Sequence, residues 1–283
     1  MKAGLLDFAD LSIPETLDLA REAELAGFGR FWLAEHHGEA ASYADTLLMT
    51  ALVAGSTDTL RVGPAGVLLR YYAPLAVCNS ATQLAHTFPD RIDLGLAGGA
   101  AEPRAAHALA DGRDDLEHLA TFDRKVRAVM EILHGRSIPT TPRPLCLPST
   151  WLLGSGGARA MLAAEQGLAY CLSLFHRAQL PEPSLLAAYR DAFRATSGIA
   201  FPMASIAVAT VISDDGDRAR AAARDLSHGP IRRCLGGTAA EVVDQLRSVA
   251  HAYAVEEIVV LECSRGFAAR RTAVAQLGEA LRR

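Results

Sequence analysis

The chain has 283 residues, of which 50% are hydrophobic and 21% are charged, and its formal net charge is −4. This composition can build a sizeable core and excludes a chain that is disordered throughout, and the charge does not indicate nucleic acid or an anionic membrane as a partner. Five dispersed cysteines without a Cys-x-x-Cys pair are typical of reduced thiols in a cytoplasmic protein.

The N-terminus enters an apolar run at Ala3–Leu6 without a basic region before it. We therefore expect no signal peptide. We also expect no membrane span, because no apolar stretch reaches the length that a bilayer requires.

Short apolar runs alternate with longer amphipathic segments along the chain. Apolar runs without polar alternation indicate strands buried on both faces, as in a parallel sheet. The predicted strands are Ala3–Phe8, Phe31–Glu35, Leu60–Leu69, Ile92–Ala97, Thr150–Leu153, Ala169–Leu174, Ser205–Ile212 and Glu257–Glu262. The predicted helices are Pro14–Ala26, Asp45–Gly55, Pro74–His86, Asp114–His134, Ala158–Gln166, Pro183–Ala195, Asp217–Leu226, Ala239–Ala252 and Ala268–Leu281.

Local signals mark several helix ends. Ser12–Glu15 and Thr238–Glu241 have the pattern of capping boxes, in which a hydroxyl and a glutamate satisfy free N–H groups of the first turn. Gly27 and Gly135 stand where a glycine commonly ends a helix.

Strict alternation of eight strands with helices predicts one α/β domain over residues 1–283, a (β/α)8 barrel. An open, doubly wound sheet with extra elements is the alternative. The most irregular stretches, Ala97–Gly112, Gly135–Ser149 and Ser227–Gly237, are predicted to be functional or mobile loops. In a barrel, the active site is expected at the C-terminal ends of the strands.

Glu35, His36 and His37 end the second predicted strand and are the first candidates for chemistry. Neighbouring residues of a strand point in opposite directions, so His36 and His37 are not expected to point the same way. This weakens the case for a metal site, and we find no convincing set of further ligands. Alternatively, one histidine caps the strand end and bonds a neighbouring loop.

Two glycine-containing segments are the next candidates. Gly66, after Ala65, interrupts the third apolar run, as happens where a flat ligand approaches a backbone or where crowded strands need space. Gly154, Ser155, Gly156 and Gly157 lie between the fifth strand and a helix that carries Arg159. Free N–H groups at a helix start can hold a phosphate, although glycines also serve tight turns.

Weaker candidates are acidic. Asp7 ends the first strand, where it can face the active-site mouth or make a structural hydrogen bond. Asp90–Asp93 precedes the fourth strand, at the opposite rim, and is predicted to be structural. We find neither a Gly-x-Ser-x-Gly motif nor a serine or cysteine beside an evident base.

Taken together, these segments resemble the bacterial-luciferase-like family of flavin-dependent monooxygenases. The Glu-His-His strand end and the Leu-Gly-Ser turn are the more specific motifs. The matching segments are Phe31–His37, Leu60–Leu69, Asp90–Leu96, Trp151–Ser155, Ala163–Leu168, Tyr189–Phe193, Gly236–Thr238 and Glu256–Ile258. The matches follow the order of the chain over nearly its whole length.

The resemblance implies reduced FMN from a separate reductase, and an oxygenating flavin C4a-(hydro)peroxide formed with O2. It implies that His36 is the catalytic histidine and that Glu35 and His37 shape its pocket. Ala65-Gly66 matches a non-proline cis peptide against the flavin, and Gly154–Gly157 matches the phosphate loop. A deazaflavin is the less favoured cofactor. The substrate is expected to be an organic, hydrophobic molecule of the kind found in secondary metabolism.

One departure from the family pattern concerns the phosphate. The family usually has an arginine after the fourth strand, where this chain has Gly98, and its phosphate loop usually has more serines. Arg159 can replace the missing cation. The alternative function is therefore a diverged barrel with weakened or lost FMN binding, which acts as a ligand-binding protein or a non-oxygenase enzyme.

The resemblance also implies a homodimer. Family members commonly pair through the helices after strands two and three. Here Asp45–Gly55 and Pro74–His86 are notably apolar, as an interface requires.

Overall fold

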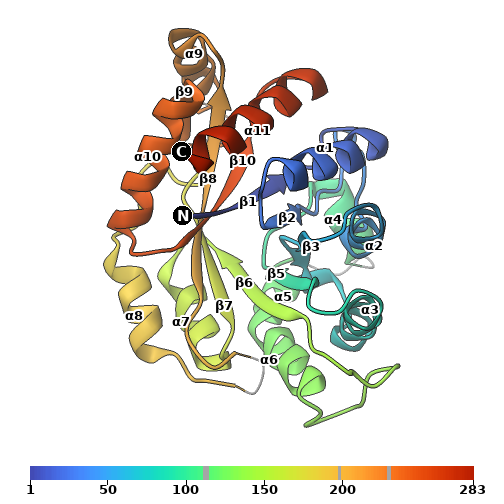
Figure 1. The fold of residues 1–283 in the computed structure, drawn as a ribbon. Helices are drawn as coiled ribbons and strands as arrows, with labels where there is room; N and C mark the ends of the chain where they lie inside the picture. Colours follow the sequence, from blue (N-terminus) through green and yellow to red (C-terminus); the bar gives the residue numbers. More distant parts are fainter. Residues whose placement is uncertain (111–114, 197–198, 228–230) are drawn as a thin grey trace.

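The computed structural model describes residues 1–110, 115–196, 199–227 and 231–283 (Figure 1). Its strands are β1 (Lys2–Asp7), β2 (Arg30–Leu33), β3 (Arg61–Pro64), β4 (Val67–Leu68), β5 (Asp93–Ala97), β6 (Ser149–Gly154), β7 (Ala169–Ser173), β8 (Ala204–Ile212), β9 (Cys234–Gly237) and β10 (Glu257–Glu262). Its α-helices are α1 (Ile13–Leu25), α2 (Thr46–Ser56), α3 (Pro74–Thr87), α4 (Pro103–Leu109), α5 (Asp115–Ala120), α6 (Phe122–Leu133), α7 (Gly157–Gln166), α8 (Ser184–Ala192), α9 (Gly216–Leu226), α10 (Ala239–Ala252) and α11 (Phe267–Arg282).

The strands form one parallel sheet in the order β3-β2-β1-β10-β8-β7-β6-β5-β4. A bridge between Val62 of β3 and Ile92, the residue before β5, connects β3 to the strand next to the other end of this order and so closes the barrel. Helices surround the sheet (Figure 1). The predicted (β/α)8 barrel is thus confirmed, and the open doubly wound sheet is excluded.

Most predicted elements are present within one to three residues, and their end signals are confirmed. Ser12 and Glu15 form a complete capping box at α1, as Thr238 and Glu241 do at α10. Gly27 has a positive φ of 86°, a conformation that a glycine adopts without steric cost after a helix end.

Three local predictions were wrong. The predicted helix Asp114–His134, whose first residue lies outside the described residues, is divided at Thr121 into α5 and α6. The predicted loops Ala97–Gly112 and Ser227–Gly237, which both extend into residues that are not described, contain α4 and β9. β9 is glycine-rich and is a strand because β8 extends beyond β7 and offers it a partner.

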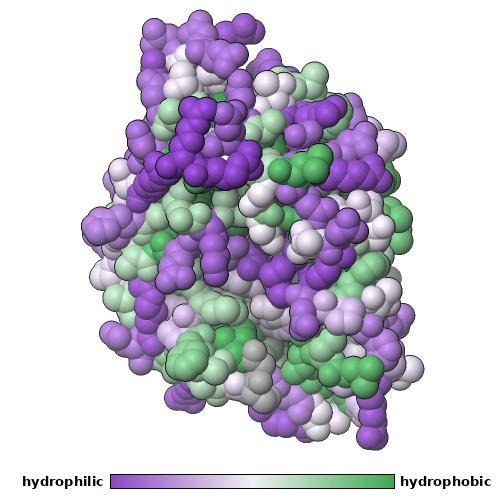
Figure 2. All heavy atoms as spheres, viewed as in Figure 1, coloured by the Kyte–Doolittle hydropathy of each residue, from purple (hydrophilic) through white to green (hydrophobic). Residues whose placement is uncertain are grey.

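Side chains of the barrel strands alternate between the interior and the helix layer. On β2, Trp32 and the following Ala34 belong to the interior cluster, whereas Phe31 and Leu33 pack with the helices. This alternation decides which polar residues beyond each strand reach the barrel mouth. Outside the barrel, α9 buries only Ala219 and Ala223, and hydrophilic residues cover it in Figure 2.

A charged network closes the N-terminal end of the barrel. Arg30 bonds Asp93 and Glu257, and its guanidinium lies 4.9 and 4.7 Å from the ring centroids of Trp32 and Trp151. Asp93 is fully buried, so these bonds compensate for the cost of removing its charge from water. The structural role predicted for Asp90–Asp93 agrees with this arrangement.

Among the described residues, no helix combines the length and the apolar character needed to cross a membrane.

Candidate active site

His36 reaches the C-terminal mouth of the barrel because it continues the interior series of β2. Its ring lies 4.4 Å from that of Phe8, the residue after β1. Its Nε2 atom is buried and has no hydrogen-bond partner among the residues that the structure describes. Burial, and next the neighbouring His37, lower the pKa of His36, while Asp10 acts in the opposite direction. His36 therefore presents a neutral imidazole near pH 7 with one ring nitrogen unused.

Glu35 and His37 lie on the other side of the strand, as the alternation requires. The Glu35 carboxylate binds His37 Nε2 at 2.7 Å and accepts hydrogen bonds from Tyr72 Oη at 2.8 Å and Leu68 N at 3.0 Å. Both residues line a groove of about 740 Å³ between α2 and α3. The structure therefore separates them from the His36 side chain and ties Glu35 to the chain that follows β3.

Asp7 also faces the helix layer. It is 1% exposed, and its Oδ2 accepts hydrogen bonds from Tyr43 Oη at 2.6 Å and Ala9 N at 3.2 Å. Burial is the main cause of its raised pKa, which the bond from Tyr43 and the charge of Arg270 oppose. These contacts join the end of β1 to the loop before α2.

The expected cis peptide between Ala65 and Gly66 is present. It separates β3 from β4, so the predicted single strand Leu60–Leu69 is interrupted there. A Cβ atom on Gly66 would lie 2.8 Å from the backbone of Gly95 in β5. A glycine is therefore required at position 66, because two backbones approach too closely for a side chain.

The Gly154–Gly157 turn joins β6 to α7. The helix begins after Gly156, and no side chain caps its first turn. Tyr170 Oη donates a hydrogen bond of 3.1 Å to the Gly156 carbonyl and holds the turn against β7. Ser155 is half-buried in this turn. The arrangement leaves backbone N–H groups at the positive end of a helix near the barrel mouth.

Arg159 fills the space next to Gly98. A Cβ atom on Gly98 would lie 3.3 Å from Arg159 Nη2 and 3.5 Å from the Phe122 ring. The guanidinium lies 4.3 Å from the centroid of that ring and forms an ion pair with Asp123. A cation from α7 therefore occupies the region that follows the fourth strand of the barrel.

Four residues near the mouth were not identified from the sequence: Phe8, Asp10, Ser173 and His176. Asp10 accepts two hydrogen bonds of 2.7 Å from Arg270, and this contact lowers the pKa of the Asp10 carboxyl group. Ser173 Oγ lies 2.7 Å from His176 Nδ1. The signal was available, since Asp10 and His176 follow β1 and β7 by three residues and such loops lie at the same barrel end as His36.

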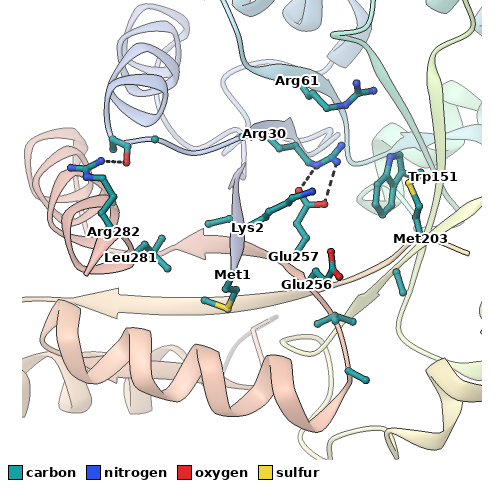
Figure 3. A pocket seen from close by; sticks show the side chains of 18 of the residues that line it. Met1, Lys2, Arg30, Arg61, Trp151, Met203, Glu256, Glu257, Leu281 and Arg282 are labelled. Carbon is teal, nitrogen blue, oxygen red and sulfur yellow. Dashed lines mark hydrogen bonds and ion pairs between the residues drawn. The ribbon is translucent and has the colours of Figure 1, made fainter.

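A cavity of about 760 Å³ lies at the other end of the barrel (Figure 3). It surrounds the start of β1 and the paired side chains of Arg30 and Glu257, which a dashed line joins in Figure 3. Arg282 on its wall bonds the Ala26 carbonyl. Active sites of barrels of this kind lie at the opposite face, at the C-terminal ends of the strands, so we place the candidate site around His36.

Comparison with known proteins identifies the family. Residues 1–256 match the model of the luciferase-like monooxygenase family, and the chain belongs to this family of enzymes. The chain is 33% identical over 221 residues to YceB of Bacillus subtilis, covering 74% of this chain and 65% of YceB. It is 31% identical over 229 residues to a luciferase-like monooxygenase of Escherichia coli strain K12, covering 76% of this chain and 67% of that protein. The matched region thus spans about two thirds of these relatives.

Solved structures agree with the family. The crystal structure of apo-MsnO8 superposes with a TM-score of 0.86, at 26% identity, over 99% of this chain and 98% of that one. The same fold is found in the oxygenating constituent of 3,6-diketocamphane monooxygenase from Pseudomonas putida in complex with FMN (TM-score 0.75, 13% identity, 99% and 97% coverage). It is also found in an F420-dependent secondary alcohol dehydrogenase (TM-score 0.78, 15% identity, 100% coverage of both chains). FMN and F420 are thus the cofactors named for those two proteins, and at this level of identity they show that the fold is shared.

Proposed function

We propose that this protein is the oxygenase of a two-component system. It binds reduced FMN delivered by a separate reductase and inserts one oxygen atom from O2 into a hydrophobic organic substrate. The observation that carries the proposal is His36, whose neutral ring stands at the barrel mouth with a buried and unpaired Nε2 atom. A buried ring nitrogen without a partner is costly unless a ligand completes its hydrogen bonding.

The mouth suits a flat, largely apolar ring. Phe8, Ala65 and Leu153 are only partly buried and pack on the interior cluster, so they form an apolar floor that is open on one side. They come from the ends of β1, β3 and β6, around the cis peptide. A flavin ring on this floor would lie within the circle of strand ends that includes His36.

The phosphate of FMN fits the start of α7. Backbone N–H groups of Gly154–Gly157 and the helix dipole attract an anion, and the Ser155 hydroxyl can add a hydrogen bond. We infer that Arg159 replaces the family's arginine, because its guanidinium reaches the space beside Gly98 from another element. A guanidinium forms strong, charge-assisted bonds with phosphate. Asp123, its present partner, keeps this cation in place.

Bound reduced flavin would supply the two electrons that activate O2. The chain's own contribution is to hold and move a proton: His36, neutral near pH 7, can accept or donate through Nε2 at the mouth. Glu35 acts at a distance from the chemistry, since its bond to Leu68 N fixes the chain after the cis peptide. His37 and Tyr72 hold that carboxylate in turn.

Two further observations concern the oligomeric state and the cellular location of the protein. We propose a homodimer through α2 and α3, because Leu48 and Leu52 of α2 are 58% and 41% exposed beside the apolar groove between these helices. Burying such side chains in a symmetric contact is favourable. The dispersed free thiols favour a cytoplasmic location.

Gly98 supports a second candidate function. Because Arg159 already pairs with Asp123, its charge is partly neutralised before any phosphate arrives. A protein with this second function binds reduced FMN with a dissociation constant of about 1 mM or higher. It uses the barrel mouth for another ligand or for a different reaction. A deazaflavin is the remaining cofactor alternative, and its affinity is measured in the same way.

Labelled oxygen tests the first function. The chain is mixed with a flavin reductase, NADH, FMN and a set of hydrophobic substrates under ¹⁸O2, and products are analysed by mass spectrometry. We expect one labelled atom per product molecule and about 100-fold less product with His36→Ala, which should still bind reduced FMN. Equal product from this variant would remove His36 from its role. Oxidised product that carries no ¹⁸O, and has therefore taken its oxygen from water, would contradict the proposed oxygenation.

A further inference from the structure

A second histidine stands at the barrel mouth, three residues after the end of strand β7. His176 is three residues beyond Ser173, and its Nδ1 atom lies 2.7 Å from the Ser173 hydroxyl. Ala169 and Cys171 of β7 belong to the interior cluster, so Ser173, two residues further, also faces the interior. The hydrogen bond therefore draws the imidazole of His176 back over the inner end of its strand, toward the mouth.

Aromatic rings connect this histidine to His36. Ring centroids are 4.4 Å apart for His36 and Phe8, 6.1 Å for Phe8 and Phe175, and 4.2 Å for Phe175 and His176. The four rings come from the ends of β2, β1 and β7, and they form a chain of neighbouring rings that begins and ends with an imidazole.

The serine also selects the tautomer of His176. Among the described residues, the Ser173 hydroxyl makes its only hydrogen bond with this ring. Both groups are satisfied when the hydroxyl donates to Nδ1, which leaves the hydrogen of the neutral ring on Nε2. His176 then offers an N–H donor, while His36 offers its unpaired Nε2.

We propose that His176 is a second acid–base residue of this site, which binds an oxygen atom at the reacting end of the substrate from the side opposite His36. This inference rests on the proposed oxygenase function and extends it. The oxygen atom is that of a hydroxyl or carbonyl group, because either can accept a hydrogen bond from the Nε2–H of His176. A hydroxyl would also be able to donate to His36.

The charges around the two rings agree with such a pair. His36 is faced by His37 on its own strand, by Asp10 after β1 and by His176 after β7, and Arg270 of α11 holds Asp10. Contact with the neighbouring rings removes part of the His176 imidazole from water and, with the charge of His36, lowers its pKa, although the residue as a whole is exposed. The two imidazoles therefore disfavour double protonation, and at most one of them carries the extra proton near neutral pH.

The first test needs no flavin. The pKa of His176 is measured by NMR in the wild-type protein, in His36→Gln and in His251→Gln, which alters an exposed histidine on α10. We expect a higher pKa in His36→Gln only, because a like charge has been removed. If His176 has the same pKa in all three proteins, the proposed interaction between the two histidines is refuted. In Ser173→Ala, we expect ¹⁵N shifts of a tautomer mixture, and a retained single tautomer would overturn the role of Ser173.

The second test measures the reaction. With reduced FMN and a substrate found by labelling, His176→Gln should lower kcat by about 100-fold while the affinity for reduced FMN stays at the wild-type value. His251→Gln should keep the wild-type kcat. An unchanged kcat in His176→Gln would overturn the proposal. If the wild-type protein fails to bind reduced FMN, the oxygenase function is refuted, whereas the NMR titrations still decide whether the two histidines interact.

Discussion

Glu262 makes the stability of this protein depend on pH. It ends β10, is 1% exposed, and its carboxylate accepts hydrogen bonds from Ile212 N at 3.2 Å, from Ser264 N at 2.8 Å and from the Ser264 hydroxyl at 2.8 Å. Burial nevertheless dominates and raises its pKa from 4.5 to about 7. Ionisation is therefore easier in the unfolded chain than in the folded protein.

The sign and size of the effect follow from this shift. Below about pH 4.5 both states are protonated, so Glu262 costs nothing; as pH rises toward 7, only the unfolded state gains from ionising, and the folded state loses stability. One pKa unit corresponds to about 1.4 kcal/mol, so the loss between pH 5 and pH 8 is about 2.5 kcal/mol. Above the raised pKa the loss is constant.

The variant Glu262→Gln tests this reasoning by urea unfolding at about pH 5 and about pH 8. At low pH the wild-type group is a carboxylic acid, whose hydroxyl oxygen can still accept a hydrogen bond, whereas the NH2 end of the amide cannot. The variant should therefore be less stable by about 1–2 kcal/mol at low pH. Its disadvantage should vanish or reverse at high pH. Glu131→Gln, at an exposed position of α6, serves as the control and should follow the wild-type curve. A stability difference between wild type and Glu262→Gln that is the same at both pH values would refute the reasoning.

Three further predictions concern the site and its support. Glu35→Ala leaves the buried Leu68 N–H without an acceptor and should lower the free energy of unfolding by about 1–3 kcal/mol. The control Glu39→Ala, at an exposed position, should not change it. If the two variants are equally stable, Glu35 does not hold the chain after β3 in place. Asp10→Asn removes a negative charge near His36, so NMR should give a lower pKa for His36, and an unchanged or higher value would exclude this interaction. Leu48→Glu should convert the dimer to a monomer in analytical ultracentrifugation, while Leu145→Glu, exposed elsewhere, should leave it intact; a dimer that survives Leu48→Glu would argue against the α2–α3 interface.

The sequence predicts the barrel well because each strand and helix has its own local pattern. Alternation along Phe31–His37 also predicts correctly that His36 and His37 point apart, and His36 alone reaches the mouth. The same rule, applied to β1, would have directed Asp7 to the helix layer, where the structure places it beside Tyr43. Orientation was therefore predictable wherever strand register was known.

Contacts between distant elements were harder to predict. Arg159 lies beside Gly98 because α7 packs near α6, with Phe122 beneath the guanidinium. His176 turns toward the mouth only through its bond to Ser173, in a segment that follows the strand. β9 exists because β8 extends past its neighbours. None of these arrangements has a periodic signal in the sequence, since each depends on tertiary packing.

The affinity for reduced FMN tests the central claim most directly. An anaerobic titration follows the absorbance of reduced FMN with the wild-type protein, with Arg159→Gln and with Arg136→Gln, an exposed arginine after α6. We predict saturable wild-type binding well below about 1 mM, about tenfold weaker binding by Arg159→Gln, and no change in Arg136→Gln. A wild-type protein that shows no binding up to about 1 mM would contradict a reduced-flavin site at the mouth of this barrel.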